Sequence, residues 1–150
     1  MAQQVEKKLM NEWLDLNFPA WITLKNQRIG AVVPPGKPGE VISFEEKYAK
    51  GFRRYADVIL TDGNSVKIIE FDVRAKAEGP AALELYNRLL PDTVELTTLK
   101  NKPIELIYVV AFPDPVIEAV CKEKGIVYIV YQPDWIKTYW TEKMALAEGE

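Results

Sequence analysis

The fold is decided by two β-rich runs and the turn between them, RYADVIL (54–60), TDGN (61–64) and SVKIIEFDV (65–73). Both runs are rich in β-branched and aromatic residues, which favour extended backbone. The Asp62-Gly63 step supplies the positive φ that a tight hairpin turn needs. The sequence therefore predicts an antiparallel hairpin, and its second strand, which is apolar on both faces, is expected to lie inside a sheet.

Helix and strand patterns continue on both sides of the hairpin. Apolar residues spaced by three and four predict a helix over residues 2–16, before Pro19. The later elements are a helix over 80–90, a strand over 104–112, a helix over 115–124, a buried strand over 126–131 and a helix from 135 to about 147; residues 21–33 form one or two strands around a turn at 25–27, and 44–51 a short helix or loop. The strand, helix, strand order of 104–131 predicts a parallel βαβ unit. The expected fold is α/β with a mixed sheet and helices on both faces.

Composition limits the chemistry that the chain can perform. Its 150 residues, 48% of them hydrophobic, suit a single domain spanning residues 1–150. The absence of histidine excludes Ser-His-Asp and Cys-His nucleophile systems and His-ligated zinc. A lone cysteine, Cys121, is expected to be a buried small hydrophobe, and with no disulfide available the expected compartment is the cytoplasm, or a host cytoplasm for a viral protein. No apolar run approaches the length of a membrane span, so no membrane partner is expected.

Three acidic residues converge at the open end of the predicted hairpin. Glu70 and Asp72 are two residues apart on one strand, so both point to the same side. Pairing across the turn brings Asp57 to the level of residue 69 or 70. Carboxylates placed together need a cation, a basic partner or a raised pKa, and a cluster without histidine suits Mg²⁺ or Mn²⁺. The alternative is that Glu70 and Asp72 emerge into solvent while Asp57 pairs with Arg53 or Arg54.

These features together resemble the PD-(D/E)xK nuclease superfamily, which has the restriction-endonuclease-like fold. The resemblance lies in the Asp of RYADVIL, the hairpin, the EFD strand end (70–72) and the helix AALELYNRLL (81–90), and it spans about residues 5–131. It implies that Asp57, Glu70 and the main-chain carbonyl of Phe71 bind the metal ion. The segment VEKKL (5–9) resembles the archaeal Holliday-junction resolvase branch of the superfamily, which makes Glu6 a fourth ligand.

The chain departs from the family pattern at the motif lysine, whose position is occupied by Asp72. Because an acid cannot stabilise a negatively charged transition state as lysine does, the resemblance leaves activity open. Arg74 and Lys76 follow Asp72, and either could supply the missing charge or simply neutralise the acids. Neutralising Asp72 is expected to stabilise the metal-free protein, because it removes repulsion between acids.

Basic residues gather around this acidic site in the sequence. Residues 47–76 contain seven basic and four acidic residues, although the whole chain has a net charge of −3. A local excess of positive charge suits contacts with nucleic-acid phosphates. The expected DNA-binding residues are Arg53, Arg54, Arg74 and Lys76.

The sequence thus predicts a metal-dependent DNA endonuclease with Asp57, Glu70, Asp72 and Lys76 as catalytic residues. The alternative is a catalytically inactive module with the same fold that binds nucleic acid or a protein partner, and the missing lysine favours it. A third reading is an assembly protein that forms a homodimer through its last helix. There, Trp135, Tyr139 and Trp140 are expected to form core or dimer contacts rather than to stack on bases.

Overall fold

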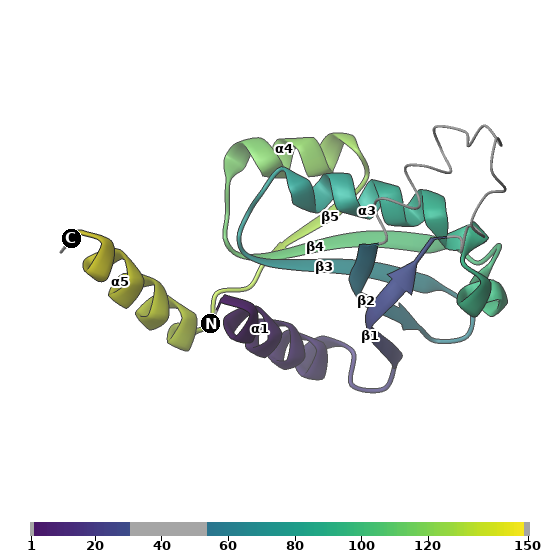
Figure 1. Ribbon diagram of the computed structural model, residues 1–150, viewed down its shortest axis with the longest axis horizontal. Coiled ribbons are helices and arrows are strands. Elements are labelled where there is room, and N and C mark those ends of the chain that lie inside the picture. The colour runs from purple at the N-terminus through teal and green to yellow at the C-terminus, as the bar shows by residue number, and fades with distance from the viewer. Residues whose placement is uncertain (1, 31–53, 149–150) are drawn as a thin grey trace, which may run out of the picture.

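The computed structural model describes residues 2–30 and 54–148 of the chain. In this part of the chain five strands form one mixed sheet in the order β1-β2-β3-β4-β5 (Figure 1). The strands are β1 (Ile22–Ile29), β2 (Arg54–Thr61), β3 (Val66–Arg74), β4 (Ile104–Phe112) and β5 (Val127–Val130). The first three strands form an antiparallel meander, and β3, β4 and β5 run parallel. The predicted α/β class, a mixed sheet with an antiparallel hairpin and a parallel βαβ end, is confirmed.

Helices cover both faces of this sheet. They are α1 (Ala2–Asn17), α3 (Glu78–Leu89), α4 (Pro115–Glu123) and α5 (Asp134–Glu148), with two 3-10 helices, η1 (Leu90–Asp92) and η2 (Val94–Leu99), after α3. Helix α1 lies on one face and α3 and α4 lie on the other, while α5 extends away from the sheet (Figure 1). Within residues 2–30 and 54–148, every helix is too short or too polar to span a lipid bilayer.

The predicted hairpin is present, with β2 and β3 as its strands. Val58 pairs with Ile69 and Thr61 with Val66. The carboxylate of Asp62 accepts the backbone N–H groups of Asn64 and Ser65 at 2.9 and 2.8 Å, and Gly63 has a φ of 94°. The turn therefore closes because a short acidic side chain caps its amides and because a glycine takes the left-handed conformation.

Strand β1 differs from the sequence prediction. The sequence predicts one or two strands around a turn at 25–27, whereas residues 22–29 form one continuous strand without a turn there. The interruption lies at Asn26, which has a φ of +50° between the paired positions Lys25 with Val58 and Gln27 with Ala56. The polar residues that suggested a turn therefore form a local distortion inside a strand that is paired on both sides of it.

Two further elements also differ from the predicted pattern. Helix α3 begins at Glu78, before Pro80, because proline is accommodated in a first helical turn. Strand β5 was expected to be buried, but Val127 and Val130 are 38% and 48% exposed. Its only neighbour in the described sheet is β4, so it is an edge strand with part of its apolar surface uncovered. The predicted segment 44–51 lies outside the described residues.

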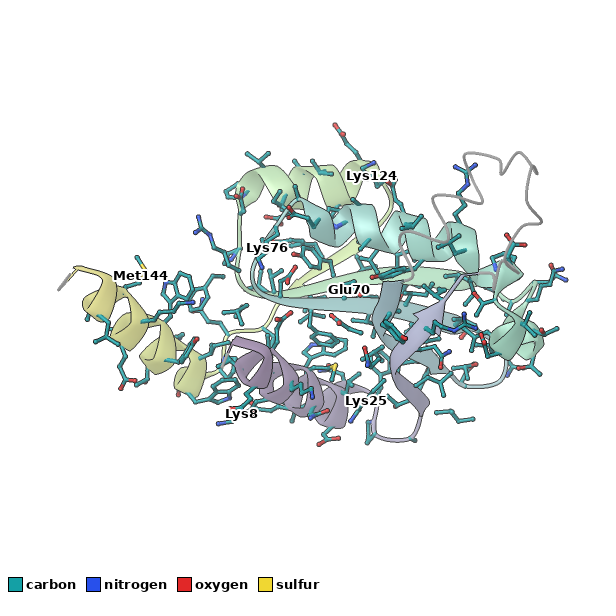
Figure 2. All side chains as sticks on the ribbon, in the orientation of Figure 1. Lys8, Lys25, Glu70, Lys76, Lys124 and Met144 are labelled. Carbon is teal, nitrogen blue, oxygen red and sulfur yellow. The ribbon has the colours of Figure 1, made fainter. Side chains whose placement is uncertain are left out.

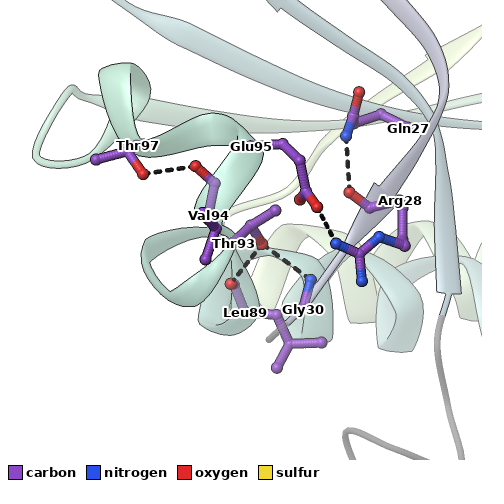
Figure 3. Close-up of polar contacts among 8 residues, drawn as sticks. All are labelled: Gln27, Arg28, Gly30, Leu89, Thr93, Val94, Glu95 and Thr97. Carbon is purple, nitrogen blue, oxygen red and sulfur yellow. Dashed lines mark hydrogen bonds and ion pairs between the residues drawn. The ribbon is translucent and has the colours of Figure 1, made fainter. Parts of the chain in front are cut away.

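A polar network holds the end of β1 against the segment that follows α3 (Figure 3). The buried Thr93 hydroxyl accepts the Gly30 N–H and donates to the Leu89 carbonyl, both at 2.9 Å. Beside it, Arg28 forms an ion pair with Glu95. The Thr93 hydroxyl thus satisfies the Gly30 N–H and the Leu89 carbonyl, and the network links the end of β1 to the segment after α3.

Two aromatic residues of α5, Trp135 and Trp140, are half-buried and make contacts within the chain. The Trp140 ring stacks on Phe112 with 4.7 Å between ring centroids. Trp135 donates its indole N–H to Glu12 on α1, and Lys8 lies 4.2 Å from the centroid of the same ring. These contacts attach the first part of α5 to α1 and β4. Cys121 is fully buried, as expected.

Candidate functional site

The candidate site lies where β2 and β3 separate. Their backbone pairing runs from Thr61 with Val66 to Val58 with Ile69. At the next position the Asp57 N–H donates to Glu70 Oε1 at 3.0 Å, and the Phe71 N–H donates to Asp57 Oδ2 at 2.9 Å. The two carboxylates thus accept hydrogen bonds from backbone N–H groups, in place of the bonds between the strands that a continuing ladder would have. The structure places Asp57 and Glu70 side by side, at the level that hairpin pairing predicted.

Asp72 continues the row of acids but has a partner that the sequence did not reveal. The Tyr108 hydroxyl donates to Asp72 Oδ2 and accepts the backbone N–H of Lys76 at 3.0 Å. The Tyr108 side chain is fully buried on β4, beside Glu70 in the parallel register. The expectation that neutralising Asp72 stabilises the metal-free protein stays a prediction, and the hydrogen bond from the buried Tyr108 hydroxyl opposes that gain.

Helix α1 contributes the fourth acid. Glu6 shares a side-chain hydrogen bond with Asp72, and the charges of Asp72 and Asp57 both act on it. Helix α1 packs against β3, where the Trp13 ring meets the Phe71 ring edge-on with 5.6 Å between the ring centroids. This packing brings the start of the helix to the acids of β2 and β3. The residue that only the resemblance suggested as a ligand therefore lies in the acidic cluster, which we define as Glu6, Asp57, Glu70 and Asp72.

All four carboxyl groups of the acidic cluster have raised pKa values. Burial is the largest cause in each case, because it removes water from the charged form. Burial and the neighbouring charges of Asp72 and Asp57 raise the pKa of Glu6 to about 7. The pKa of Glu70 lies well above its ordinary value, with the Asp57 charge as the second cause. The surroundings therefore do not stabilise four negative charges at once, and these carboxyl groups hold their protons more tightly than exposed ones.

The donor set of the cluster suits a hard divalent cation, because carboxylate oxygens are the ligands that Mg²⁺ and Mn²⁺ prefer. Among the described residues, however, no three acidic or cysteine side chains already stand in the arrangement of a metal site. Asp57 and Glu70 each accept a backbone N–H instead. The residues fit such an ion in chemistry, and binding it would require the acidic side chains to move closer together.

A cavity of about 630 Å³ opens beside the acidic cluster, between α1 and β1. Two of the acids, Glu6 and Asp57, form part of its wall. Its other lining residues are Lys7, Met10, Asn11, Lys25, Asn26 and Phe71. The sequence prediction missed this cavity, although Lys7, Met10 and Asn11 share one face of α1 through their spacing of three and four residues.

The predicted DNA-binding residues are placed unevenly. Lys76 is exposed on the loop between β3 and α3 (Figure 2). Its charge acts on both Glu6 and Asp72. Arg74 is exposed at the end of β3. Arg53 and the side chain of Arg54 lie outside the part that the structure describes. Lys7 and Lys25, which the sequence prediction did not include, line the cavity next to Asp57.

This fold is shared with solved nuclease structures. No protein-family model and no curated protein matches the chain. A repair endonuclease from Pyrococcus abyssi is similar in structure, with a TM-score of 0.55 and 10% sequence identity over 85% of this chain and 47% of that one. The structure of an EndoMS–dsDNA2 complex is similar with a TM-score of 0.50 and 13% identity, over 85% and 45% of the two chains. The chain thus spans less than half the length of either protein, and the similarity establishes the fold.

Proposed function

We propose that this chain is a metal-dependent DNA endonuclease of the PD-(D/E)xK type, which hydrolyses phosphodiester bonds with Mg²⁺ or Mn²⁺. The observation that carries the proposal is the acidic cluster, in which four carboxyl groups with raised pKa values meet where β2 and β3 separate. Lysines beside the cluster offer contacts for phosphate. The similarity of the fold to a repair endonuclease supports the same conclusion.

In the proposed site Asp57, Glu70, Glu6 and the carbonyl of Phe71 would hold the ion. A divalent cation there supplies charge that polarises a phosphodiester and activates water. Lys76 would face the phosphate with the positive charge that the motif lysine provides elsewhere. Asp72 fixes the Tyr108 hydroxyl, which in turn holds the backbone of Lys76. The acid in the lysine position thus orients the loop that carries a replacement cation.

A second function is favoured by one observation, the hydrogen bond between Asp72 and Tyr108. The residue at the motif-lysine position, Asp72, thus makes a structural contact. This suits a module that has kept the fold and lost the hydrolytic activity. Such a module would bind DNA or a protein partner without cutting.

Calorimetric titration with Mn²⁺ tests the proposal directly. Wild type should bind the ion, whereas Glu70→Gln and Asp57→Asn should not, and Glu142→Gln on the exposed face of α5 is the matched control. At a concentration 100 times its Kd, the ion should stabilise wild type by about 2.7 kcal/mol in a thermal melt. The two acid variants should show no such gain, because a neutral amide lacks the negative charge with which a carboxylate attracts a hard divalent cation.

Cleavage assays then separate the two functions. Single-stranded, duplex, flap and junction DNA are incubated with Mg²⁺ or Mn²⁺, and cutting by wild type but not by Glu70→Gln supports the endonuclease. Binding of DNA with no cutting of any form would support the inactive module. A wild type that neither binds Mn²⁺ nor cuts DNA would overturn the proposed endonuclease.

A further inference from the structure

The cavity between α1 and β1 is the feature that the proposed metal site leaves unexplained. Its wall includes Glu6 and Asp57, so anything bound in it lies against the acidic cluster. Its polar lining from outside the cluster consists of Lys7 and Asn11 on α1 and of Lys25 and Asn26 on β1. Met10 and Phe71 add an apolar part.

We propose that this cavity is a subsite for the backbone of one DNA strand, in which Lys7 and Lys25 bind phosphate and Asn26 completes the polar wall. The inference rests on the proposed endonuclease function and adds to it the position and the residues of a substrate contact. The proposal also specifies that the subsite binds one strand. A cavity of about 630 Å³ has the size of a small-ligand pocket, so it admits a nucleotide-sized group rather than a duplex.

The charges around the cavity suit a phosphate only at its basic side. Glu6 and Asp57 would repel an anion, whereas Lys7 and Lys25 attract it, and both kinds of residue line the same space. A strand held by the lysines would therefore run past the acidic cluster rather than into it. A phosphate next to one bound by a lysine would then lie near Asp57, where the proposed ion is held.

Lys25 is held in position before any ligand arrives. Its ammonium group donates to Asn11 Oδ1 at 2.7 Å, which links β1 to α1. Both residues line the cavity, and the Lys25 side chain is exposed enough to reach a ligand from solvent. An ammonium that is already oriented loses less conformational entropy on binding a phosphate.

The distortion of β1 is located at the same cavity. Asn26 has a φ of +50° and faces the position of Asp57 in the register, while Lys25 and Gln27 pair normally on either side. A left-handed residue other than glycine costs roughly 1–2 kcal/mol, and asparagine tolerates the conformation best. Strain of this kind persists where the surrounding structure requires it and is frequent at ligand sites. Here it accompanies an amide side chain in the wall beside Asp57.

The test compares a double variant, Lys7→Gln with Lys25→Gln, with a control of equal charge, Lys100→Gln with Lys122→Gln. Both control lysines are exposed, one after η2 and one on α4, outside the cavity lining. Binding of fluorescein-labelled single-stranded and duplex DNA is followed by anisotropy in Ca²⁺ at several salt concentrations. Thermal melts of both variants show that they are folded.

The cavity variant should bind single-stranded DNA about tenfold more weakly than the control variant. The slope of log affinity against log salt should fall by about 1.4 for a single strand, since each lost phosphate contact removes about 0.7. Asn26→Gly, which allows the same φ but removes the amide, should weaken binding by a smaller factor, roughly threefold, as expected for one neutral hydrogen bond.

Equal affinity and equal salt slope in the cavity and control variants would overturn the subsite. Calorimetry with Mn²⁺ distinguishes this failure from failure of the proposed function, because the cavity variant keeps every carboxylate and should still bind the ion. Wild type that binds Mn²⁺ and cuts DNA, together with an unaffected cavity variant, would refute the subsite alone. Wild type that binds neither Mn²⁺ nor DNA would refute both.

Discussion

Replacing Glu6 with glutamine should stabilise the metal-free protein at pH 8 and leave its stability unchanged at pH 4.5. Burial and the charges of Asp72 and Asp57 raise the pKa of Glu6 from 4.5 to about 7. The folded chain therefore holds this proton more tightly than the unfolded chain, and the contribution of Glu6 to stability falls as pH rises through that interval. At about 1.36 kcal/mol per pKa unit the fall would approach roughly 3 kcal/mol for a fully buried group. Because Glu6 is partly exposed, solvent screening reduces the expected gain to about 1 kcal/mol.

The measurements are urea unfolding and thermal melting in EDTA at the two pH values, with Glu142→Gln on α5 as the control for loss of one exposed charge. A gain of 1 kcal/mol corresponds to a rise in Tm of roughly 3 °C for a chain of this size. Stabilisation of equal size at pH 4.5 and pH 8 would show that repulsion within the acidic cluster is not its cause. Destabilisation at pH 8 would show that Glu6 is held by a favourable contact in its charged form.

Three further predictions concern the groups around Tyr108 and the turn of α3. Tyr108→Phe should lower the free energy of unfolding by about 1–3 kcal/mol in urea melts, because it leaves Asp72 and the Lys76 N–H without their partner. Asp72→Ala should cost a similar amount, whereas Asp72→Asn, whose amide oxygen can still accept the hydroxyl, should cost less than 1 kcal/mol; equal losses would contradict the hydrogen bond as the cause. Gly79→Ala should destabilise by about 1–3 kcal/mol, since its Cβ would lie 2.6 Å from the Tyr108 hydroxyl oxygen, and an unchanged Tm would show that the ring can move aside.

The sequence was sufficient for the parts of the fold that depend on local pattern. The hairpin, β4 and the helix after it were predicted to within about two residues, because turn chemistry and apolar periodicity are properties of neighbouring residues. The proximity of Asp57 to Glu70 also followed from such a property, the register set by the turn at Gly63. The burial of β5 could not be predicted, since an apolar run is the same in a central strand and at an edge.

The missed residues of the candidate site depend on contacts between distant segments. Tyr108 appeared as one apolar position in a buried strand, and only the parallel register of β3 and β4 brings its hydroxyl to Asp72. Lys7 and Lys25 belong to different elements, and the cavity between them exists because α1 packs against the sheet. The sequence around Asn26 predicts a turn because asparagine adopts positive φ readily, both in turns and in a distorted strand such as β1.

The separation of β2 from β3 explains why polar side chains occupy this place in the sheet. Where a ladder opens inside a protein, the freed N–H groups need acceptors, and the Asp57 and Glu70 carboxylates provide them. A neutral acceptor would satisfy the same bonds, as an asparagine or glutamine could, without the cost of gathering four carboxyl groups with raised pKa values. Backbone satisfaction therefore accounts for polar residues at these positions but not for their charge. A bound cation would account for the charge, and this is why the Mn²⁺ titration of Glu70→Gln, which preserves an acceptor and removes the charge, separates the structural role of the residue from the functional one.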